Sequence, residues 1–208
     1  MSSNTAAKTP ANTTTKTRMM VQIAMLTAVA EVLMLFDFPL PFAPSFYKID
    51  LSEVPILIGC FAMGPAAGII IEAMKILLNF IISGTVTAGV GELANFAIGC
   101  SMVLPAGLIY RYHKTRKNAV LGMAAGTLVM AVIGGLLNAF VLLPAYAALF
   151  GGMDAIIGMG TAVNKNITSV QSFVLLSVVP FNLVKGVIVS LVTFLLYKHV
   201  SRVLIHNA

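Results

Sequence analysis

Long apolar stretches, separated by short polar segments, make up most of the chain. A membrane-spanning helix needs about 20 mostly apolar residues, and a shorter run suits a partial or tilted helix. The run 53–63 is of the shorter kind, and the others are nearly long enough or long enough to cross. The pattern therefore predicts an all-α membrane protein, a six-helix transmembrane bundle. The predicted helices cover residues 19–36, 53–63, 66–82, 91–112, 119–143 and 173–202.

Prolines and aromatic residues mark the connections. Three prolines within six residues stop any helix in segment 37–51, whose aromatic side chains suit an interfacial loop that folds over a site. Ser52 is the predicted N-cap of the helix that follows. Pro144 is predicted to end the fifth helix, and 145–171 to form a second outer loop, partly helical. Pro180 lies inside the last predicted helix, which membrane helices tolerate when they line cavities.

Composition and charge fix the class and the orientation. Hydrophobic residues make up 59% of the chain and charged residues 10%, whereas a soluble domain has about a quarter charged residues. No acidic residue lies in the three basic clusters, which predicts cytoplasmic N- and C-termini and no nucleic-acid surface. These clusters are Lys8, Lys16 and Arg18; Arg111, Lys114, Arg116 and Lys117; and Lys198 and Arg202.

One membrane domain is predicted, with short tails. Residues 1–17 are rich in Ser, Thr and Ala and are predicted to be a disordered cytoplasmic tail. The membrane domain covers 18–203, and 204–208 form a C-terminal tail. Cys60 and Cys100 lie in apolar runs without ligand spacing, so they are expected to be small buried hydrophobes.

Four polar residues stand out within the predicted helices: Glu92, Asn138, Asn182 and Lys185. A charged side chain near the bilayer centre costs about 2.5–3.5 kcal/mol on insertion scales, so such residues usually face a cavity or a partner. The helix directions put all four in the outer half of the membrane, which predicts a binding site open to the outside. Two structural alternatives stay open: Glu92 near a helix N-terminus, and Asn138 bonded to a neighbouring helix.

Charged pairs offer further predictions. Asn182 and Lys185 are three apart and share one helix face, where Lys185 could pair with a carboxylate such as Glu92. Glu72 and Lys75 have the same spacing and are expected to neutralise each other, with a subunit contact as the alternative.

Several catalytic signatures are missing. The sequence holds no G-x-x-x-x-G-K-[ST] phosphate loop, no H-E-x-x-H and no cysteine cluster. Its three histidines, His113, His199 and His206, lie in the stretches predicted to be cytoplasmic, within four residues of a Lys or Arg. The chain is therefore not expected to be an enzyme, and no catalytic residue, metal site or cofactor is assigned.

Three stretches resemble a known family, the substrate-binding S components of energy-coupling factor (ECF) vitamin transporters, in particular the riboflavin-specific type. They lie within 37–59, at 89–96 (GVGELANF) and at 180–186 (PFNLVKG). The resemblance implies a six-helix fold that holds riboflavin near the outer surface. It implies vitamin contacts at Glu92, Asn138, Asn182 and Lys185, with Tyr47 and Asn95 as further contacts.

The resemblance also implies partners. S components work with one transmembrane energising subunit and two ATPase subunits, and they contact these through small-residue helix surfaces. Ala24 and Ala28 give the first helix such a surface. Two other functions remain open: an S component for another vitamin, and a membrane subunit that uses a flavin for redox chemistry.

Overall fold

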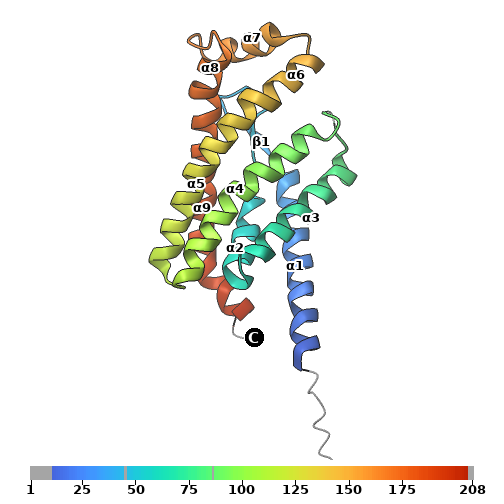
Figure 1. Ribbon diagram of the computed structural model, residues 1–208, viewed down its shortest axis with the longest axis vertical. Coiled ribbons are helices and arrows are strands. Elements are labelled where there is room, and N and C mark those ends of the chain that lie inside the picture. The colour runs from blue at the N-terminus through green and yellow to red at the C-terminus, as the bar shows by residue number, and fades with distance from the viewer. Residues whose placement is uncertain (1–10, 45, 86, 206–208) are drawn as a thin grey trace, which may run out of the picture.

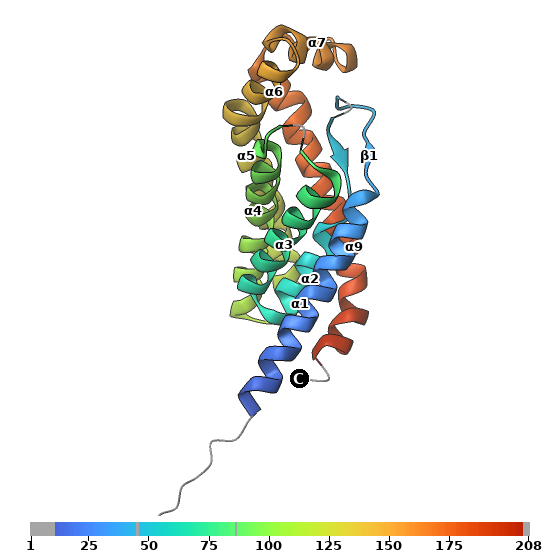
Figure 2. The same ribbon diagram turned by 90° about the vertical axis from the view of Figure 1, so that its right-hand side faces the viewer.

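The computed structural model is a bundle of helices standing roughly side by side, with shorter elements gathered at one end (Figures 1 and 2). It describes residues 11–44, 46–85 and 87–205, and side chains within 16–197. The elements are α1 (Ala11–Leu35), β1 (Phe38–Pro39), β2 (Lys48–Ile49), α2 (Glu53–Met63), α3 (Pro65–Ser83), α4 (Val90–Tyr112), α5 (Arg116–Leu137), the π-helical turn η1 (Asn138–Leu142), α6 (Leu143–Leu149), α7 (Met153–Val163), α8 (Val170–Phe173), the π-helical turn η2 (Val174–Val178) and α9 (Val179–Ile205).

Five of the described helices are long and apolar enough to cross a membrane. The remaining predicted helix, 53–63, corresponds to α2, which has 11 residues and is too short to cross a bilayer by itself. Large apolar side chains on the long helices are exposed, among them Leu128 at 63% and Leu195 at 61%. Such faces suit lipid contact, and the chain is a multi-pass membrane protein.

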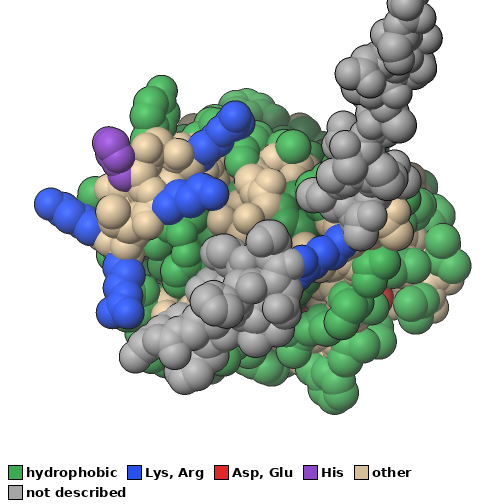
Figure 3. Space-filling model, turned by 90° about the horizontal axis from the view of Figure 1, so that it is seen from below, with side chains coloured by type: hydrophobic (Ala, Val, Ile, Leu, Met, Phe, Trp, Pro, Cys, Tyr) green, Lys and Arg blue, Asp and Glu red, His purple; other side chains and the backbone are tan. Residues whose placement is uncertain are grey.

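The two ends of the bundle differ. The start of α1, the α4–α5 connection and the end of α9 lie at the lower end in Figure 1. Lys and Arg side chains gather on this face in Figure 3, and we call it the basic end. The hairpin β1–β2 and helices α6, α7 and α8 lie at the opposite end, which we call the cavity end.

The prediction that Pro144 ends the fifth helix is wrong. The helix continues through η1 into α6, so that one span runs over Arg116–Leu149. Pro144 comes two residues after η1, and Pro180 comes two residues after η2. Proline lacks the backbone N–H that an α-helix needs and its ring clashes with the preceding turn. The wider π turns just before both prolines accommodate these defects, so neither helix ends there.

The loop after α1 also differs from its prediction. Within it, β1 and β2 pair antiparallel, with Phe38 opposite Ile49. Ser52 is the N-cap residue of α2 as predicted, but its side chain makes no capping hydrogen bond to the helix. Its hydroxyl and backbone N–H both donate to the carboxylate of Asp50 instead. At the N-terminus, α1 begins at Ala11, within the stretch predicted to be a disordered tail, and residues 1–10 lie outside the described part.

Two apolar clusters hold the bundle together. The first centres on α2, with Ile56 and Leu57 fully buried among residues of α4 and α5 such as Met102 and Met130. The second joins the loop after α1 to the cavity end, where Tyr47 packs with residues such as Phe173. The two clusters leave a space between the cavity end and the middle of the bundle, where the polar residues converge.

Candidate functional site

A cavity of about 560 Å³ opens at the cavity end. Pockets for small ligands usually measure about 300–1,000 Å³, so its size suits a vitamin-sized molecule. All six residues singled out from the sequence line it: Tyr47, Glu92, Asn95, Asn138, Asn182 and Lys185. The rest of the wall is made by Met34, Leu35, Asp37, Phe46, Lys48, Asp50, Asn79, Ser83, Thr87, Gly91, Ile98, Leu142, Tyr146 and Phe181.

The two π turns position the two buried asparagines. Asn138 is the first residue of η1, and its Nδ2 donates to the carbonyl of Gly134 at 2.8 Å. Nδ2 of Asn182 donates at 2.9 Å to the carbonyl of Val178, the last residue of η2. These bonds use one donor of each amide and fix its orientation. Each side chain retains further hydrogen-bonding capacity at the cavity wall.

The loop after α1 covers the cavity with aromatic side chains. The Tyr47 hydroxyl donates to Oδ1 of Asn138 at 2.5 Å. Burial, and then the nearby Tyr146, raise the pKa of Tyr47, so the hydroxyl keeps its proton and remains a donor. Phe46 lies 5.5 Å from Tyr146 between ring centroids, and Tyr47 lies 5.3 Å from Phe181. The loop is therefore tied to two helices by aromatic packing and one hydrogen bond.

Glu92 and Asn95 come from the first turns of α4. Both are half-buried, and they lie three apart on one face of the helix. The Glu92 carboxylate accepts from the hydroxyls of Thr85 at 3.0 Å and Thr87 at 3.3 Å. These neutral donors leave its negative charge without a cationic partner among the described side chains.

Lys185 pairs with Asp50, and the expected pairing with Glu92 is not found. Its Nζ lies 3.1 Å from Asp50 and 3.9 Å from Glu53. Burial alone would raise the pKa of Asp50, but the ammonium groups of Lys185 and Lys75 and the hydrogen bonds from Ser52 lower it to about 2. The carboxylate is therefore ionised, and it holds the base of the loop against α9.

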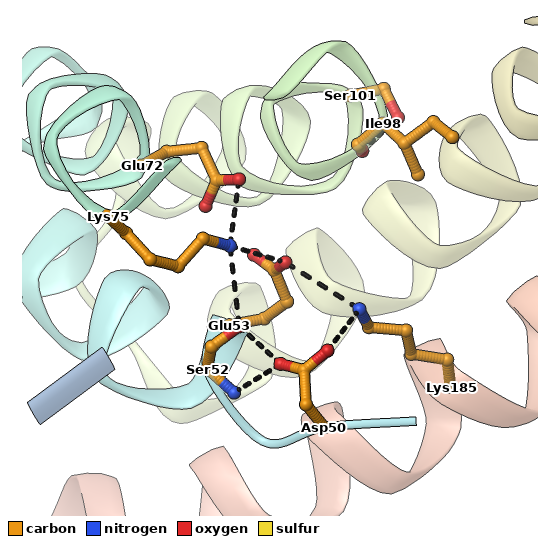
Figure 4. Close-up of polar contacts among 8 residues, drawn as sticks. All are labelled: Asp50, Ser52, Glu53, Glu72, Lys75, Ile98, Ser101 and Lys185. Atoms are coloured by element: carbon orange, nitrogen blue, oxygen red, sulfur yellow. Dashed lines mark hydrogen bonds and ion pairs between the residues drawn. The ribbon is translucent and has the colours of Figure 1, made fainter. Parts of the chain in front are cut away.

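A second group of charges joins the loop before α2 to α2, α3 and α9 (Figure 4). Nζ of Lys75 lies 2.9 Å from Glu72 and 3.1 Å from Glu53. The predicted Glu72–Lys75 pair is confirmed, and both side chains are fully buried, which rules out their direct contact with another subunit. Two of these residues, Asp50 and Lys185, also line the cavity, and we call Asp50, Glu53, Glu72, Lys75 and Lys185 the charge cluster.

Sequence reasoning missed several polar residues of the wall, among them Asp37, Asp50 and Asn79. Asn79 had a visible signal, because it lies four residues after Lys75 and shares its helix face. Asp37 and Asp50 had none, since their position depends on a hairpin whose pairing is not visible in the apolar pattern. Among the described residues no group of three or more His, Cys, Asp or Glu side chains could hold a metal ion. Cys60 is buried, as expected, and Cys100 is partly so.

A helical membrane protein with one polar, aromatic-walled cavity near the end opposite its basic loops has the form of a membrane-embedded binding protein. Residues 18–197 match the family described as "ECF transporter, substrate-specific component". The chain belongs to this family of transport proteins and is not an enzyme.

Individual relatives agree with the family. The chain is 35% identical over 185 residues to the riboflavin transporter RibU of Staphylococcus aureus (strain TCH60), covering 89% of this chain and 91% of that one. It is 33% identical to the riboflavin transporter FmnP of Bacillus subtilis (strain 168), covering 88% and 91%. A solved structure of the S component of a bacterial ECF transporter superposes with a TM-score of 0.72 at 35% identity, covering 91% of this chain and 98% of that one.

Proposed function

We propose that the chain captures riboflavin in this cavity from the outer side of the membrane, for import by an ATP-driven ECF complex. The observation that carries the proposal is the convergence of Tyr47, Glu92, Asn95, Asn138, Asn182 and Lys185 on one cavity. They come from the loop after α1 and from α4, η1 and α9, so no single helix accounts for their meeting. The names of the relatives above support riboflavin as the ligand.

The wall chemistry suits this vitamin. The isoalloxazine ring has carbonyl acceptors and an imide N–H along one edge. Asn138 and Asn182 offer both donors and acceptors to that edge, and Lys185 offers a donor. Rings of Phe46 and Phe181 can pack against the flat faces of the ligand. The ribityl hydroxyls can donate to the carboxylate of Glu92, which accepts from two threonine hydroxyls and has no cationic partner among the described side chains.

The basic end supports this orientation. Cytoplasmic loops of membrane proteins carry an excess of Lys and Arg, which puts the α4–α5 connection and the start of α1 in the cytoplasm. The cavity end then faces the cell exterior. The last helix ends at the basic end as well, so that both termini are cytoplasmic in this arrangement.

An ATP-driven importer needs partners that bind ATP, and this sequence holds no G-x-x-x-x-G-K-[ST] phosphate loop of its own. We place the contact with the energising subunit, which carries two ATPase subunits, on α1 at Ala24 and Ala28. Both are exposed, and small residues let another helix approach closely. Ala28→Phe should keep riboflavin binding and lose uptake in cells that contain the partners. The matched control is Ala124→Phe, at an exposed position of α5; equal uptake by both variants would move the contact away from α1.

The binding proposal is tested with the chain alone. Purified in mild detergent, it should quench riboflavin fluorescence on titration, at or below micromolar concentrations. Thiamine, pantothenate and folate should fail to compete, whereas competition by one of them without riboflavin binding would assign the cavity to that vitamin. Absence of any flavin binding at micromolar concentrations would refute the proposal.

A further inference from the structure

The charge cluster contains more acids than bases. Its three carboxyl groups are those of Asp50, Glu53 and Glu72, and its two ammonium groups are those of Lys75 and Lys185. All five residues are buried, with at most 9% of their surface exposed. Fully ionised, the cluster would carry one surplus negative charge inside the bundle. A buried charge without a partner is so costly that the group usually becomes neutral instead.

Unpartnered oxygens show where the surplus lies. Oε2 of Glu53 and Oε2 of Glu72 are buried and have no hydrogen-bond partner. The carboxyl group of Glu72 packs against the bare backbone of α4 at Gly99, where an added Cβ would lie 2.7 Å from its Cδ. This close contact leaves no space for a water molecule on that side. Ionised oxygens in such a place would lose the hydration that stabilises their charge.

The three acids are unequally supported. Asp50 accepts from the backbone and hydroxyl of Ser52 as well as from Lys185. Glu53 has two ammonium groups nearby, that of Lys75 at 3.1 Å and that of Lys185 at 3.9 Å. Glu72 has one, which it shares with Glu53. Glu72 is thus the acid with the least stabilisation of its charged form.

No other charge near Glu72 compensates for this. From α4, the titratable neighbour is Cys100, which ordinarily stays a neutral thiol. From α1, Glu31 accepts from Asn79 of α3 at 3.2 Å and has a buried Oε2 without a partner, so it brings no positive charge. The loop before α2, α2 itself and α9 contribute the cluster residues already named. Among the described residues, no further cation contacts the cluster.

We infer that the charge cluster is a proton-binding site, in which Glu72 carries a proton at neutral pH and leaves the five side chains with no net charge. Asp50 and Glu53 are the ionised partners of Lys185 and Lys75. The inference needs no bound vitamin and does not rest on the proposed function. The cluster thus binds a proton in addition to forming its ion pairs.

Infrared spectroscopy of the full chain, in a detergent without ester groups, tests the site. At pH 7 the wild-type protein should show the carbonyl stretch of a protonated carboxyl group, and Glu72→Gln should lose one such group. The matched control is Glu31→Gln, the same substitution on α1, which should keep the Glu72 signal. Because glutamine resembles the neutral acid in shape and charge, Glu72→Gln should fold and unfold thermally at nearly the wild-type temperature.

Two results would overturn the inference: a wild-type spectrum at pH 7 without a protonated carboxyl group, or a spectrum of Glu72→Gln that keeps the full signal. If Glu72→Gln did not fold, Glu53→Gln would serve in its place. In that variant the cluster has two acids and two bases and needs no proton, so the signal must also fall by one carboxyl group relative to the wild type. A Glu53→Gln spectrum that keeps the full wild-type signal would place the proton outside the cluster.

Discussion

Two polar regions lie next to each other inside this membrane protein, and they differ in what their side chains face. Around the cavity, the amides of Asn138 and Asn182 bond to their own helices and keep further capacity at the wall. In the charge cluster, Lys75 is fully buried and its contacts are other cluster residues and Ser52. Polarity at membrane depth therefore marks both a ligand site and a closed ion network. What distinguishes them is that the two amides face the cavity, whereas Lys75 does not.

Like Asp50, Lys185 belongs to both regions. It lines the cavity, and it also contacts Asp50 and Glu53 of the cluster. Through Asp50 it holds the loop that carries Tyr47 over the cavity. The cluster thus helps to hold the cavity in shape. Substitutions that change residues of only one region should distinguish its effect on folding from the other's effect on binding.

The largest expected effect comes from the cluster. Lys75→Met removes a cation that Glu53 and Glu72 share, and breaking a buried pair from one side costs about 3–5 kcal/mol of folding free energy. We expect little folded protein, measured as monodisperse yield and thermal unfolding in detergent. Lys48→Met is the control, because the Lys48–Asp37 pair has side chains 46% and 40% exposed and should contribute little. A wild-type unfolding temperature for Lys75→Met would contradict this account of the cluster.

The sequence predicted the long helices and the polar residues that meet at the cavity. Helix direction and basic loops suffice for this, because they fix which residues share a depth in the membrane. The hairpin after α1 could not be predicted, since Asp50 is held by Lys185, 135 positions away in the chain. The lengths of the fifth and last helices depend on π turns before Pro144 and Pro180, which leave no mark in the apolar pattern.

A cavity substitution should act on binding and spare the fold. Asn182→Ala removes an amide at the wall, and we expect riboflavin to bind at least about tenfold more weakly, or about 1.4 kcal/mol. The unfolding temperature should change far less than in Lys75→Met. Asn118→Ala, near the basic end on α5, is the matched control. Wild-type affinity in Asn182→Ala would remove this residue from the site.

The cover of the cavity should contribute less. Tyr47→Phe keeps the aromatic packing and deletes the hydrogen bond to Asn138, which is worth about 1 kcal/mol, or roughly a fivefold loss of riboflavin affinity. The loss should appear chiefly as faster dissociation, measured by stopped-flow fluorescence. Tyr112→Phe, at an 86% exposed residue of the basic end, is the control. Unchanged dissociation from Tyr47→Phe would mean that the loop does not retain the ligand.

The smallest effect tests the space behind Asn182. A Cβ added at Gly134 would lie 2.9 Å from Nδ2 of Asn182, so the amide must shift slightly in Gly134→Ala. We expect a cost of about 0.5 kcal/mol, roughly a twofold loss of affinity in fluorescence titration. The control is Gly158→Ala on α7, where an added Cβ meets nothing within 4 Å. A larger loss than in Asn182→Ala would show that Gly134 has a second role.

The central claim is that riboflavin occupies the cavity between the loop after α1, α4, η1 and α9. A crystal structure of the purified chain grown with riboflavin tests this most directly. The account predicts the isoalloxazine ring within hydrogen-bonding distance of Asn182 and Lys185, with the ribityl chain toward Glu92. Flavin bound at another place, with the cavity unoccupied, would contradict it.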